Sequence, residues 1–237
     1  MKFLLNRLSA SSELPTRNGV YTFLNPYSYL IARRNPEIFE RFDGIYIDGQ
    51  LLAKMLSAVL RDRVTRTSFD MTSLAPKLME SAENNDKTVY LIGAKSNQID
   101  IAAAHFQEKY PKLKICGLRH GYFNSTKERS EVIRNIVRLA PDYVIVGMGT
   151  PIQEEFLLEL AAGGWRGQAF TCGGFLHQSS ERLTYYPAWV NKLHLRAPFR
   201  AFKEPRLLRR YLISYPYFIA VFAMDWLTSS HRVHRKT

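Results

Sequence analysis

Polar residues and glycines follow several apolar runs of this chain, at points where strands would end. The segments are IDG at 47–49, LIGAKS at 91–96, RHGYF at 119–123, GMGTPIQEE at 147–155 and TCGG at 171–174. A turn explains any single glycine there, because glycine adopts positive φ angles easily. Several polar strand ends in one sheet, however, indicate a ligand site, since ligands of open parallel sheets bind beyond the carboxyl ends of the strands.

The segment 147–155 offers the most varied chemistry. Gln153 has donor and acceptor groups that suit a sugar hydroxyl or the edge of a nucleobase. Glu154 falls in the first turn of the helix expected to follow, where an acid is favoured in any case. We predict that Gly149, Thr150, Gln153 and Glu154 contact a ligand, whereas Glu155 is expected to be a surface charge.

Asp48 is the best candidate for a general base. It follows the apolar run GIYI at 44–47 and precedes Gly49, so a strand end would present its carboxylate to the ligand site. The alternative is that Asp48 caps the next helix, because aspartate is a favoured capping residue. Asp70, in the segment SFDM at 68–71, is a second candidate acid, with a cap or a structural acceptor as its simpler interpretation.

Two expected helix starts and three side chains could bind a phosphate. Helices that begin after LIGAKS and GMGTP would present free N–H groups and a favourable dipole, worth about 0.3–1 kcal/mol for a nearby anion. Lys95 would add a positive charge, and Arg119 and His120 stand at another strand end. The alternatives are a solvated lysine and a structural histidine with satisfied hydrogen bonds.

The sequence lacks the common signatures of cofactor and metal sites. It has no G-x-G-x-x-G opening a strand–helix unit, no G-x-x-x-x-G-K-[ST], no G-x-S-x-G and no D-x-D pair. Cys116 and Cys172 lie far apart in apolar runs, which predicts buried thiols and neither a zinc site nor a disulfide. We therefore expect no cofactor and no metal ion.

Apolar runs alternate with helical patterns along most of the chain. Strands are expected over 20–25, 44–49, 88–93, 114–122, 142–149 and 167–174, and helices over 27–34, 50–60, 97–110, 127–140 and 153–162. Continuous apolar strands separated by helices indicate a parallel sheet with helices on both faces. We predict a Rossmann-like α/β catalytic domain over residues 1–190, followed by a basic helical appendage.

Length and composition indicate the size of the core, the presence of targeting or spanning segments, and the location of the protein. The chain of 237 residues is 46% hydrophobic and carries a formal net charge of +12, so it can bury a sizeable core. The apolar run near the N-terminus is shorter than the roughly 7–15 residues of a signal peptide. No run reaches the about 18 apolar residues of a spanning helix. A reducing, cytoplasmic location is expected.

Residues 191–237 form a basic, aromatic tail in which Glu204 and Asp225 are the acids. Tyrosine and tryptophan suit the headgroup boundary of a membrane, and arginines suit anionic lipid and phosphate oxygens. We predict that this appendage contacts an anionic membrane surface and binds the phosphate oxygens of a ligand through Arg196, Arg200, Arg206, Arg209 and Arg210. A chain that ends near Val190 should then still fold. The alternative is a helical pair packed on the core.

The order of the motifs resembles the WecG/TagA/CpsF family of bacterial glycosyltransferases. The resemblance spans about residues 21–211 and rests on FLN at 23–25, IDG, SFDMTSL at 68–74, YLIGAK at 90–95, YPKLKICGLRHGYF at 110–123, PDYVIVGMGTPIQEEF at 141–156, CGGF at 172–175 and EPRLLRRYL at 204–212. The block PD-x-V-x-V-G-x-G-x-P-x-Q-E is the most specific of these motifs.

The resemblance implies a metal-independent, inverting hexosyl- or N-acetylhexosaminyltransferase of surface polysaccharide synthesis. The donor would be a nucleoside diphosphate sugar, with UDP as the expected nucleotide. The acceptor would be a saccharide linked to a lipid diphosphate at the inner face of the cell membrane. Asp48 would be the base, and Asn25, Gly49 and Arg66 would join the substrate-binding residues. Whether the chain forms a homo-oligomer is left open.

Three positions depart from the family pattern. Phe23 stands where threonine is usual, His177 where an acid is usual and Arg196 where glutamate is usual. These departures indicate a divergent exopolysaccharide or O-antigen branch and leave the donor sugar open. The net charge of +12 also fits a rival class, the basic nucleic-acid-binding α/β proteins. The motifs weigh against this rival, and we expect no nucleic-acid partner.

Overall fold

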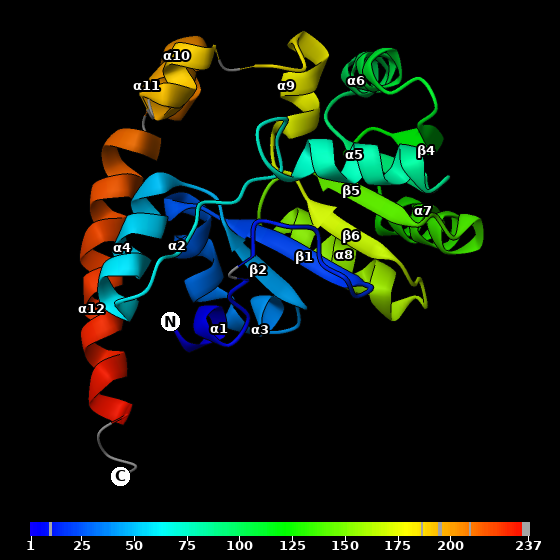
Figure 1. Ribbon diagram of the computed structural model, residues 1–237. Coiled ribbons are helices and arrows are strands. Elements are labelled where there is room, and N and C mark those ends of the chain that lie inside the picture. Colours follow the sequence, from blue (N-terminus) through cyan, green and yellow to red (C-terminus); the bar gives the residue numbers. More distant parts are fainter. Residues whose placement is uncertain (10, 186, 194–195, 209, 234–237) are drawn as a thin grey trace.

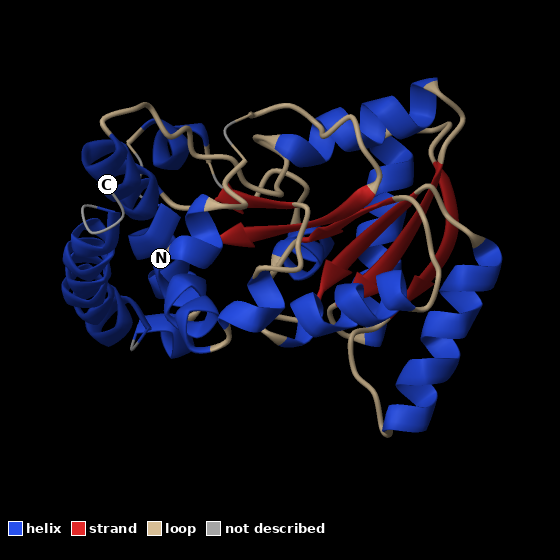
Figure 2. Cartoon of the chain, turned by 90° about the horizontal axis from the view of Figure 1, so that it is seen from below, coloured by secondary structure: helices blue, strands red, loops and turns tan. Residues whose placement is uncertain are grey.

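The structure, a computed structural model, describes residues 1–237 except residues 10, 186, 194–195, 209 and 234–237. Its centre is a six-stranded parallel sheet in the order β2-β1-β6-β5-β3-β4 (Figures 1 and 2). The strands are β1 (Gly19–Leu24), β2 (Gly44–Ile47), β3 (Thr88–Gly93), β4 (Lys114–Arg119), β5 (Tyr143–Gly147) and β6 (Gln168–Thr171). The predicted α/β class and parallel sheet are confirmed.

Strand residues alternate between two hydrophobic cores, one on each face of the sheet. In β1, Val20 and Leu24 belong to the first core, whereas Tyr21 and Phe23 belong to the second. The first core also contains residues of α1 (Lys2–Leu5), α2 (Pro26–Arg34), α3 (Pro36–Phe39), α4 (Gln50–Leu60), α7 (Thr126–Leu139), α8 (Ile152–Ala162) and α12 (Tyr215–Val233). The second contains residues of α5 (Leu74–Asn84), α6 (Ser96–Lys109) and α9 (Phe175–Glu181). Helices therefore cover both faces, as predicted.

The strands end earlier than the sequence predicts. The expected strands 114–122, 142–149 and 167–174 stop at Arg119, Gly147 and Thr171. The polar residues beyond these points do not continue the strand pairing and form loops at the carboxyl edge of the sheet. The shortening therefore leaves more loop residues at the edge where the ligand site is expected.

Helix α5 has no counterpart in the sequence prediction. Its sequence contains Pro76 in the first turn, where the missing N–H of proline removes no helical hydrogen bond. Leu74, Leu78 and Ala82 are buried at helical spacing and pack on the second core. The apolar spacing of these three residues was therefore the signal in the sequence that indicates the helix.

The C-terminal tail shares the core of the body. It continues from α10 (Ala188–Lys192) and α11 (Arg196–Lys203) through a 3-10 turn, Pro205–Leu207, and a π-helical turn, Arg210–Ser214, into α12. Phe218 and Phe222 lie 5.3 and 5.7 Å from the ring of Tyr29 in α2, between ring centroids. Asp225 accepts from the Tyr29 hydroxyl at 2.8 Å and from Nε of Arg33 at 2.8 Å. The predicted division at residue 190 is thus not a division between two cores.

Among the residues that the structure describes, none of the helices combines the length and the apolar character that spanning a membrane requires.

Candidate active site

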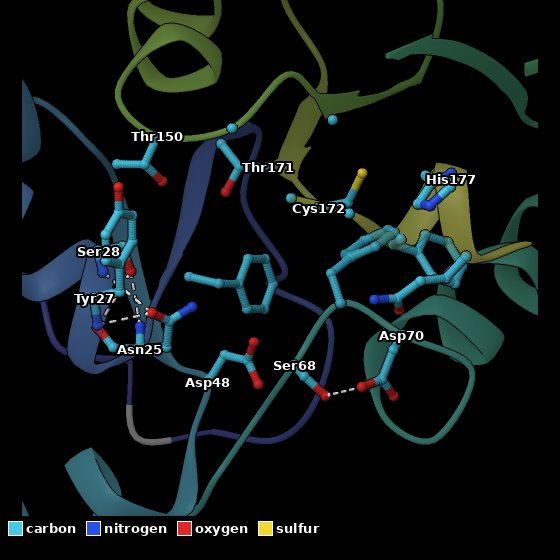
Figure 3. A pocket seen from close by; sticks show the side chains of 18 of the residues that line it. Asn25, Tyr27, Ser28, Asp48, Ser68, Asp70, Thr150, Thr171, Cys172 and His177 are labelled. Carbon is cyan, nitrogen blue, oxygen red and sulfur yellow. Dashed lines mark hydrogen bonds between the residues drawn. The ribbon is translucent and has the colours of Figure 1, made fainter. Parts of the chain in front are cut away.

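A cleft of about 1140 Å³ opens at the carboxyl ends of the strands (Figure 3). One side, here the body wall, consists of residues at or after the ends of the six strands, together with residues of the loop 66–72 and of α9. The other side, here the tail wall, consists of Arg196, Arg200, Glu204, Arg210, Tyr211 and Tyr215. The cleft lies at the edge of the sheet where the sequence places its ligand site.

A crevice in the body wall lies where the strand order reverses. The chain leaves β3 for β4 on one side and leaves β5 for β6 on the other, which is the arrangement that binds ligands in open α/β sheets. A Cβ atom on Gly93 would lie 2.4 Å from the carbonyl oxygen of Gly147, so only glycine permits this approach. Helices α6 and α8 start beside the crevice at Ser96 and Ile152, and their free N–H groups favour an anion.

Asp48 extends from the end of β2 into the cleft. Its backbone N–H donates to the carbonyl oxygen of Leu24 at 2.8 Å, which places it beside the end of β1. Gly49, at a φ of 134°, is the cap of α4, and no side chain caps that helix. The capping alternative for Asp48 is therefore wrong. The Asp48 carboxylate is 35% exposed, and its Oδ1 accepts from Nη2 of Arg66 at 2.9 Å.

Asp70 is a structural acceptor on the loop 66–72. Its Oδ2 accepts from the Ser68 hydroxyl at 2.7 Å, from Nη1 of Arg196 at 2.7 Å and from Nη2 of Arg66 at 3.2 Å. Its Oδ1 accepts from the backbone N–H of Thr72 at 2.8 Å. Burial raises the pKa of this carboxyl, but the two guanidiniums and the hydroxyl donors outweigh burial and hold the pKa at about 2. Asp70 is therefore a poor base at neutral pH.

Asn25 caps α2 and also holds an arginine of the tail wall. Its Oδ1 accepts from the backbone N–H groups of Tyr27 and Ser28 at 3.0 and 3.1 Å, and from Nη2 of Arg210 at 3.0 Å. The Arg210 guanidinium lies 3.9 Å from the centre of the Tyr27 ring. By accepting all three hydrogen bonds, Oδ1 of Asn25 joins the body wall to the tail wall.

Arg210 is a half-buried cation that forms no ion pair with the residues that the structure describes. Its Nε is buried without a hydrogen-bond partner, and burial lowers the pKa of its guanidinium below the usual value. Within the described part of the chain, the ion pairs of the tail wall join Arg196 to Asp70 and Arg200 to Glu204, and none involves Arg210. Because a partly buried, unpaired charge is costly, an anionic ligand would stabilise Arg210.

The amide of Gln153 ties two strand-end loops together. Its Oε1 accepts from the N–H groups of Gly149 at 3.3 Å and Gly173 at 3.2 Å. Its Nε2 donates to Oε1 of Glu154 at 3.0 Å and to Oγ1 of Thr150 at 3.4 Å. Gln153 lines the cleft while its amide is engaged within the protein, so a direct ligand contact stays a prediction.

Glu154 lies beneath the cleft and does not line it. Its side chain is fully buried, and its Oε1 accepts from the hydroxyls of Thr22 at 2.9 Å and Thr150 at 3.2 Å. Burial raises the pKa of this carboxyl. The structure thus does not bring Glu154 to the surface of the cleft, and the predicted ligand contact stays a prediction. Glu154 is buried because this face of α8 packs against β1 and β6. The packing turns this acid, in the first turn of α8, toward the sheet.

Arg119 and His120 are also not among the residues that line the cleft, and their predicted role in phosphate binding stays a prediction. Arg119 forms an ion pair with Glu128 in the first turn of α7 and donates to the carbonyl oxygen of His120 at 2.8 Å. Nδ1 of His120 accepts from the backbone N–H of Tyr122 at 3.3 Å. Both side chains hold the turn after β4, because Glu128 supplies the anion locally. Gly121 and Tyr122 line the cleft in their place.

The structure brings most other predicted residues together. Those that line the cleft are Asn25, Asp48, Gly49, Arg66, Asp70, Lys95, Gly149, Thr150, Gln153, Arg196, Arg200 and Arg210. Arg209 lies outside the described residues, and the side chain of Arg206 is likewise not described. The predicted residues therefore come from both walls, although they are far apart in the sequence.

Sequence reasoning missed several hydroxyl and aromatic residues of the cleft. These are Tyr27, Ser68, Thr72, Tyr211 and Tyr215. A usable signal existed for two of them, since Tyr27 follows the capping Asn25 and Tyr211 follows the basic segment EPRLLRR. Phe23 and His177, two positions that depart from the family pattern, also line the cleft. The described residues contain no group of three or more His, Cys, Asp or Glu side chains that could hold a metal ion.

Comparisons with known proteins agree with the motif order. A model described as the glycosyl transferase WecG/TagA/CpsF family matches residues 1–232. The chain is 35% identical over 221 residues to a UDP-Gal:alpha-D-GlcNAc-diphosphoundecaprenol beta-1,4-galactosyltransferase of Shigella boydii, with 93% of this chain and 91% of that protein covered.

A second group of relatives carries a different sugar name. The chain is 26% identical over 194 residues to an N-acetylglucosaminyldiphosphoundecaprenol N-acetyl-beta-D-mannosaminyltransferase of Bacillus subtilis (strain 168), with 77% of this chain and 75% of that protein covered. A protein of the same name from Bacillus spizizenii is 26% identical over 203 residues, which cover 83% of this chain and 76% of that protein.

Proposed function

The chain belongs to the WecG/TagA/CpsF family of glycosyl transferases, and from this premise we propose that it moves a sugar from a nucleoside diphosphate to a saccharide on a polyprenyl diphosphate. One observation carries the proposal. The cleft has the carboxylate of Asp48 on the body wall and the half-buried cation of Arg210 on the tail wall. Displacement of a diphosphate needs a base and an anion site in one cleft.

The proposed reaction is a single displacement at the anomeric carbon. The acceptor hydroxyl oxygen forms a bond to this carbon, and its proton passes to the carboxylate of Asp48. The bond from the anomeric carbon to the diphosphate oxygen breaks, and the diphosphate leaves with the electron pair. The configuration inverts, which is consistent with the beta linkages in the names of both groups of relatives.

The leaving diphosphate would bind between the two walls. The N-termini of α6 and α8 face the crevice beside Gly93 and Gly147, and Lys95 and Arg210 line the same cleft. Preorganised N–H groups and cations stabilise charge that develops in the transition state. Arg66, which donates to Asp48 at 2.9 Å, would hold the base in place and is not free to serve as a second phosphate clamp.

The relatives suggest which donors to test first. UDP-galactose comes first, because the 35% identical relative is named for it. A donor of N-acetylmannosamine comes second, since the relatives with 26% identity are named for that sugar. Both groups are named for an N-acetylglucosaminyl diphosphoundecaprenol acceptor.

Transfer to lipid is the direct test of this function. Purified protein would be incubated with N-acetylglucosaminyl diphosphoundecaprenol and a panel of radiolabelled nucleotide sugars, and the label in the lipid fraction would be counted. We expect label from one nucleotide sugar of the panel, about 10²–10⁴-fold slower labelling with Asp48→Asn, and tight binding of UDP. Folded protein that transfers no sugar, yet binds RNA with a strong dependence on salt, would favour the nucleic-acid alternative.

We also propose that the tail rests on the surface of the membrane that carries the acceptor, at its inner face. Large apolar side chains of the tail are strongly exposed, with fractions of 88% for Phe202, 65% for Leu212 and 61% for Leu227. Their burial at the headgroup boundary would be favourable, and nearby arginines would attract anionic lipid. This arrangement would bring the cleft, which the tail wall borders, close to the acceptor.

Sedimentation with vesicles tests the membrane contact. The full chain should sediment with vesicles that contain anionic phosphatidylglycerol, and the double variant Phe202→Ser, Leu212→Ser should sediment much less. Ile101→Ser is the matched control, because Ile101 is 44% exposed on α6 of the body. Equal sedimentation of all three proteins would contradict the proposed surface.

A further inference from the structure

A chain of alternating charges connects the tail wall to Asp48. Nη1 of Arg196 lies 2.7 Å from Oδ2 of Asp70, and Nη2 of Arg66 lies 3.2 Å from the same oxygen. The same Nη2 lies 2.9 Å from Oδ1 of Asp48. Figure 3 shows Asp48 and Asp70 at one side of the cleft with Ser68 between them in this view. Two guanidiniums and two carboxylates thus balance in charge.

Arg66 is shared between the two carboxylates. Because one of its nitrogen atoms donates to both Asp48 and Asp70, a change in charge at Asp70 alters how strongly Arg66 holds Asp48. The side chains of Arg66 and Asp70 are only 16% and 17% exposed, whereas Asp48 is 35% exposed. Such partly buried charges are screened less by salt than surface pairs are.

Arg196 grips the loop 66–72 at two points. Its Nη1 donates to Asp70 at 2.7 Å, and its Nη2 donates to Oγ1 of Thr72 at 2.6 Å. The hydroxyl of Thr72 in turn donates to Oδ1 of Asp70. The seating of the tail wall is therefore linked to the same carboxylate that competes for Arg66.

We propose that Asp70 is a positioning residue that sets the electrostatic environment of Asp48 and couples it to the seating of the tail through Arg196. The inference rests on the proposed function, since it takes Asp48 as the base. With Arg196 in place, Asp70 divides its charge between two guanidiniums and leaves Arg66 to hold Asp48. When Arg196 withdraws, Asp70 binds Arg66 more fully, and Asp48 loses part of its positive partner. The base is thus set for reaction when the tail covers the cleft.

Other titratable groups of the cleft do not account for this coupling. Burial raises the pKa values of Tyr211 and Tyr215, both of which Asp48 influences, so their hydroxyls stay protonated near neutral pH. Arg200 and Arg210 line the same cleft, and guanidiniums keep their charge across the accessible pH range. His177, Glu204 and Lys95 also line it, with Nε2 of His177 3.9 Å from Glu181 and Oε1 of Glu204 3.0 Å from Nε of Arg200. The variants His177→Gln, Glu204→Gln and Lys95→Met show whether any of these side chains contributes to the limb.

The pH dependence of kcat/KM tests the proposal, because two variants should shift its acidic limb in opposite directions. Asp70→Asn removes a negative charge, so the acidic limb of the profile should move to lower pH. Arg196→Gln removes a positive charge, so the limb should move to higher pH. Each shift should be about 0.5–1 pH unit, which is roughly a three- to tenfold change in kcat/KM on the limb. The double variant restores the charge balance and should bring the limb back toward that of the unchanged protein.

Controls separate this proposal from a merely structural role. Arg129→Gln also removes one positive charge, from a pair with Glu159 outside the cleft, and should leave the limb in place. If Asp70→Asn and Arg196→Gln lower kcat without moving the limb, or move it in one direction, Asp70 is only structural. If Asp70→Asn does not fold, the shift in Arg196→Gln decides alone. Unchanged turnover in Asp48→Asn would instead overturn the proposed base itself.

Discussion

The two walls of the cleft are held in place in different ways. On the body wall, Asp48 follows a strand directly, and its backbone N–H is bonded to the carbonyl oxygen of Leu24. On the tail wall, Arg196 and Arg210 are joined to the body by side-chain contacts with Asp70 and Asn25, and the firm attachment of the tail lies farther along in α12. The proposed function thus assigns proton transfer to the body wall, which backbone hydrogen bonds hold in place. It assigns anion binding to the tail wall, which contacts between charged and polar side chains hold in place.

The largest effect is expected from the body wall. Asp48→Asn keeps the shape of the side chain but removes the base, so turnover should fall by about 10²–10⁴-fold, while the affinity for UDP and the free energy of unfolding change little. Turnover of the lipid-linked acceptor measures the loss. Asp62→Asn, an exposed acid after α4, is the control and should behave like the unchanged protein. A variant at Asp48 with near-normal turnover would remove the body wall from the chemistry.

The next largest effect concerns the attachment of the tail. Phe222→Ala removes a ring that is 1% exposed in the first core, so the free energy of unfolding should fall by about 3–5 kcal/mol. Urea unfolding measures the change, with Phe202→Ala as a control that should cost little because its ring is 88% exposed. A chain that ends near Val190 lacks Phe218 and Phe222 of the first core, so the prediction that it still folds tests how far the body depends on the tail. A stable chain of that length would show that the tail is a separate unit after all.

Arg210 should affect ligand binding without harming stability. Arg210→Met removes a half-buried cation that lacks a carboxylate partner among the described residues, so the free energy of unfolding should stay the same or rise. The affinity for UDP should fall by about ten- to a hundredfold, because a hydrogen bond to a charged group contributes about 1.5–3 kcal/mol. Calorimetry measures both quantities, with Arg138→Met on the surface as the control. Unchanged UDP affinity would leave the tail wall without its proposed role.

The smallest effect is expected on removing metal ions. If helix N-termini, Lys95 and Arg210 neutralise the diphosphate, treatment with EDTA should leave transfer unchanged within error. Activity that disappears with EDTA and returns with Mg²⁺ or Mn²⁺ would show that neither wall suffices to neutralise the leaving group.

The positions of the strands were accessible from the sequence, whereas the neighbours that individual side chains meet were not. The alternation of apolar runs predicted each of the six strands and placed Asp48 and Gly149 at the carboxyl edge. The same reasoning assigned Glu154 to the ligand, although it lies fully buried beneath the cleft. Arg119 was assigned to the phosphate, although Glu128 engages it. Both placements have one cause, since a local pattern does not show which neighbour a side chain meets.

The sequence by itself determined the family, the α/β sheet and the body wall, because strands, turns and caps depend on residues that are near one another in the chain. Only the tertiary structure decided how the tail takes part. Asp70 and Arg196 are 126 positions apart and Asn25 and Arg210 are 185 positions apart, and no local pattern encodes such pairs. They form because α12 buries Phe218 and Phe222 against α2, which brings the arginines of the tail over the ends of the strands.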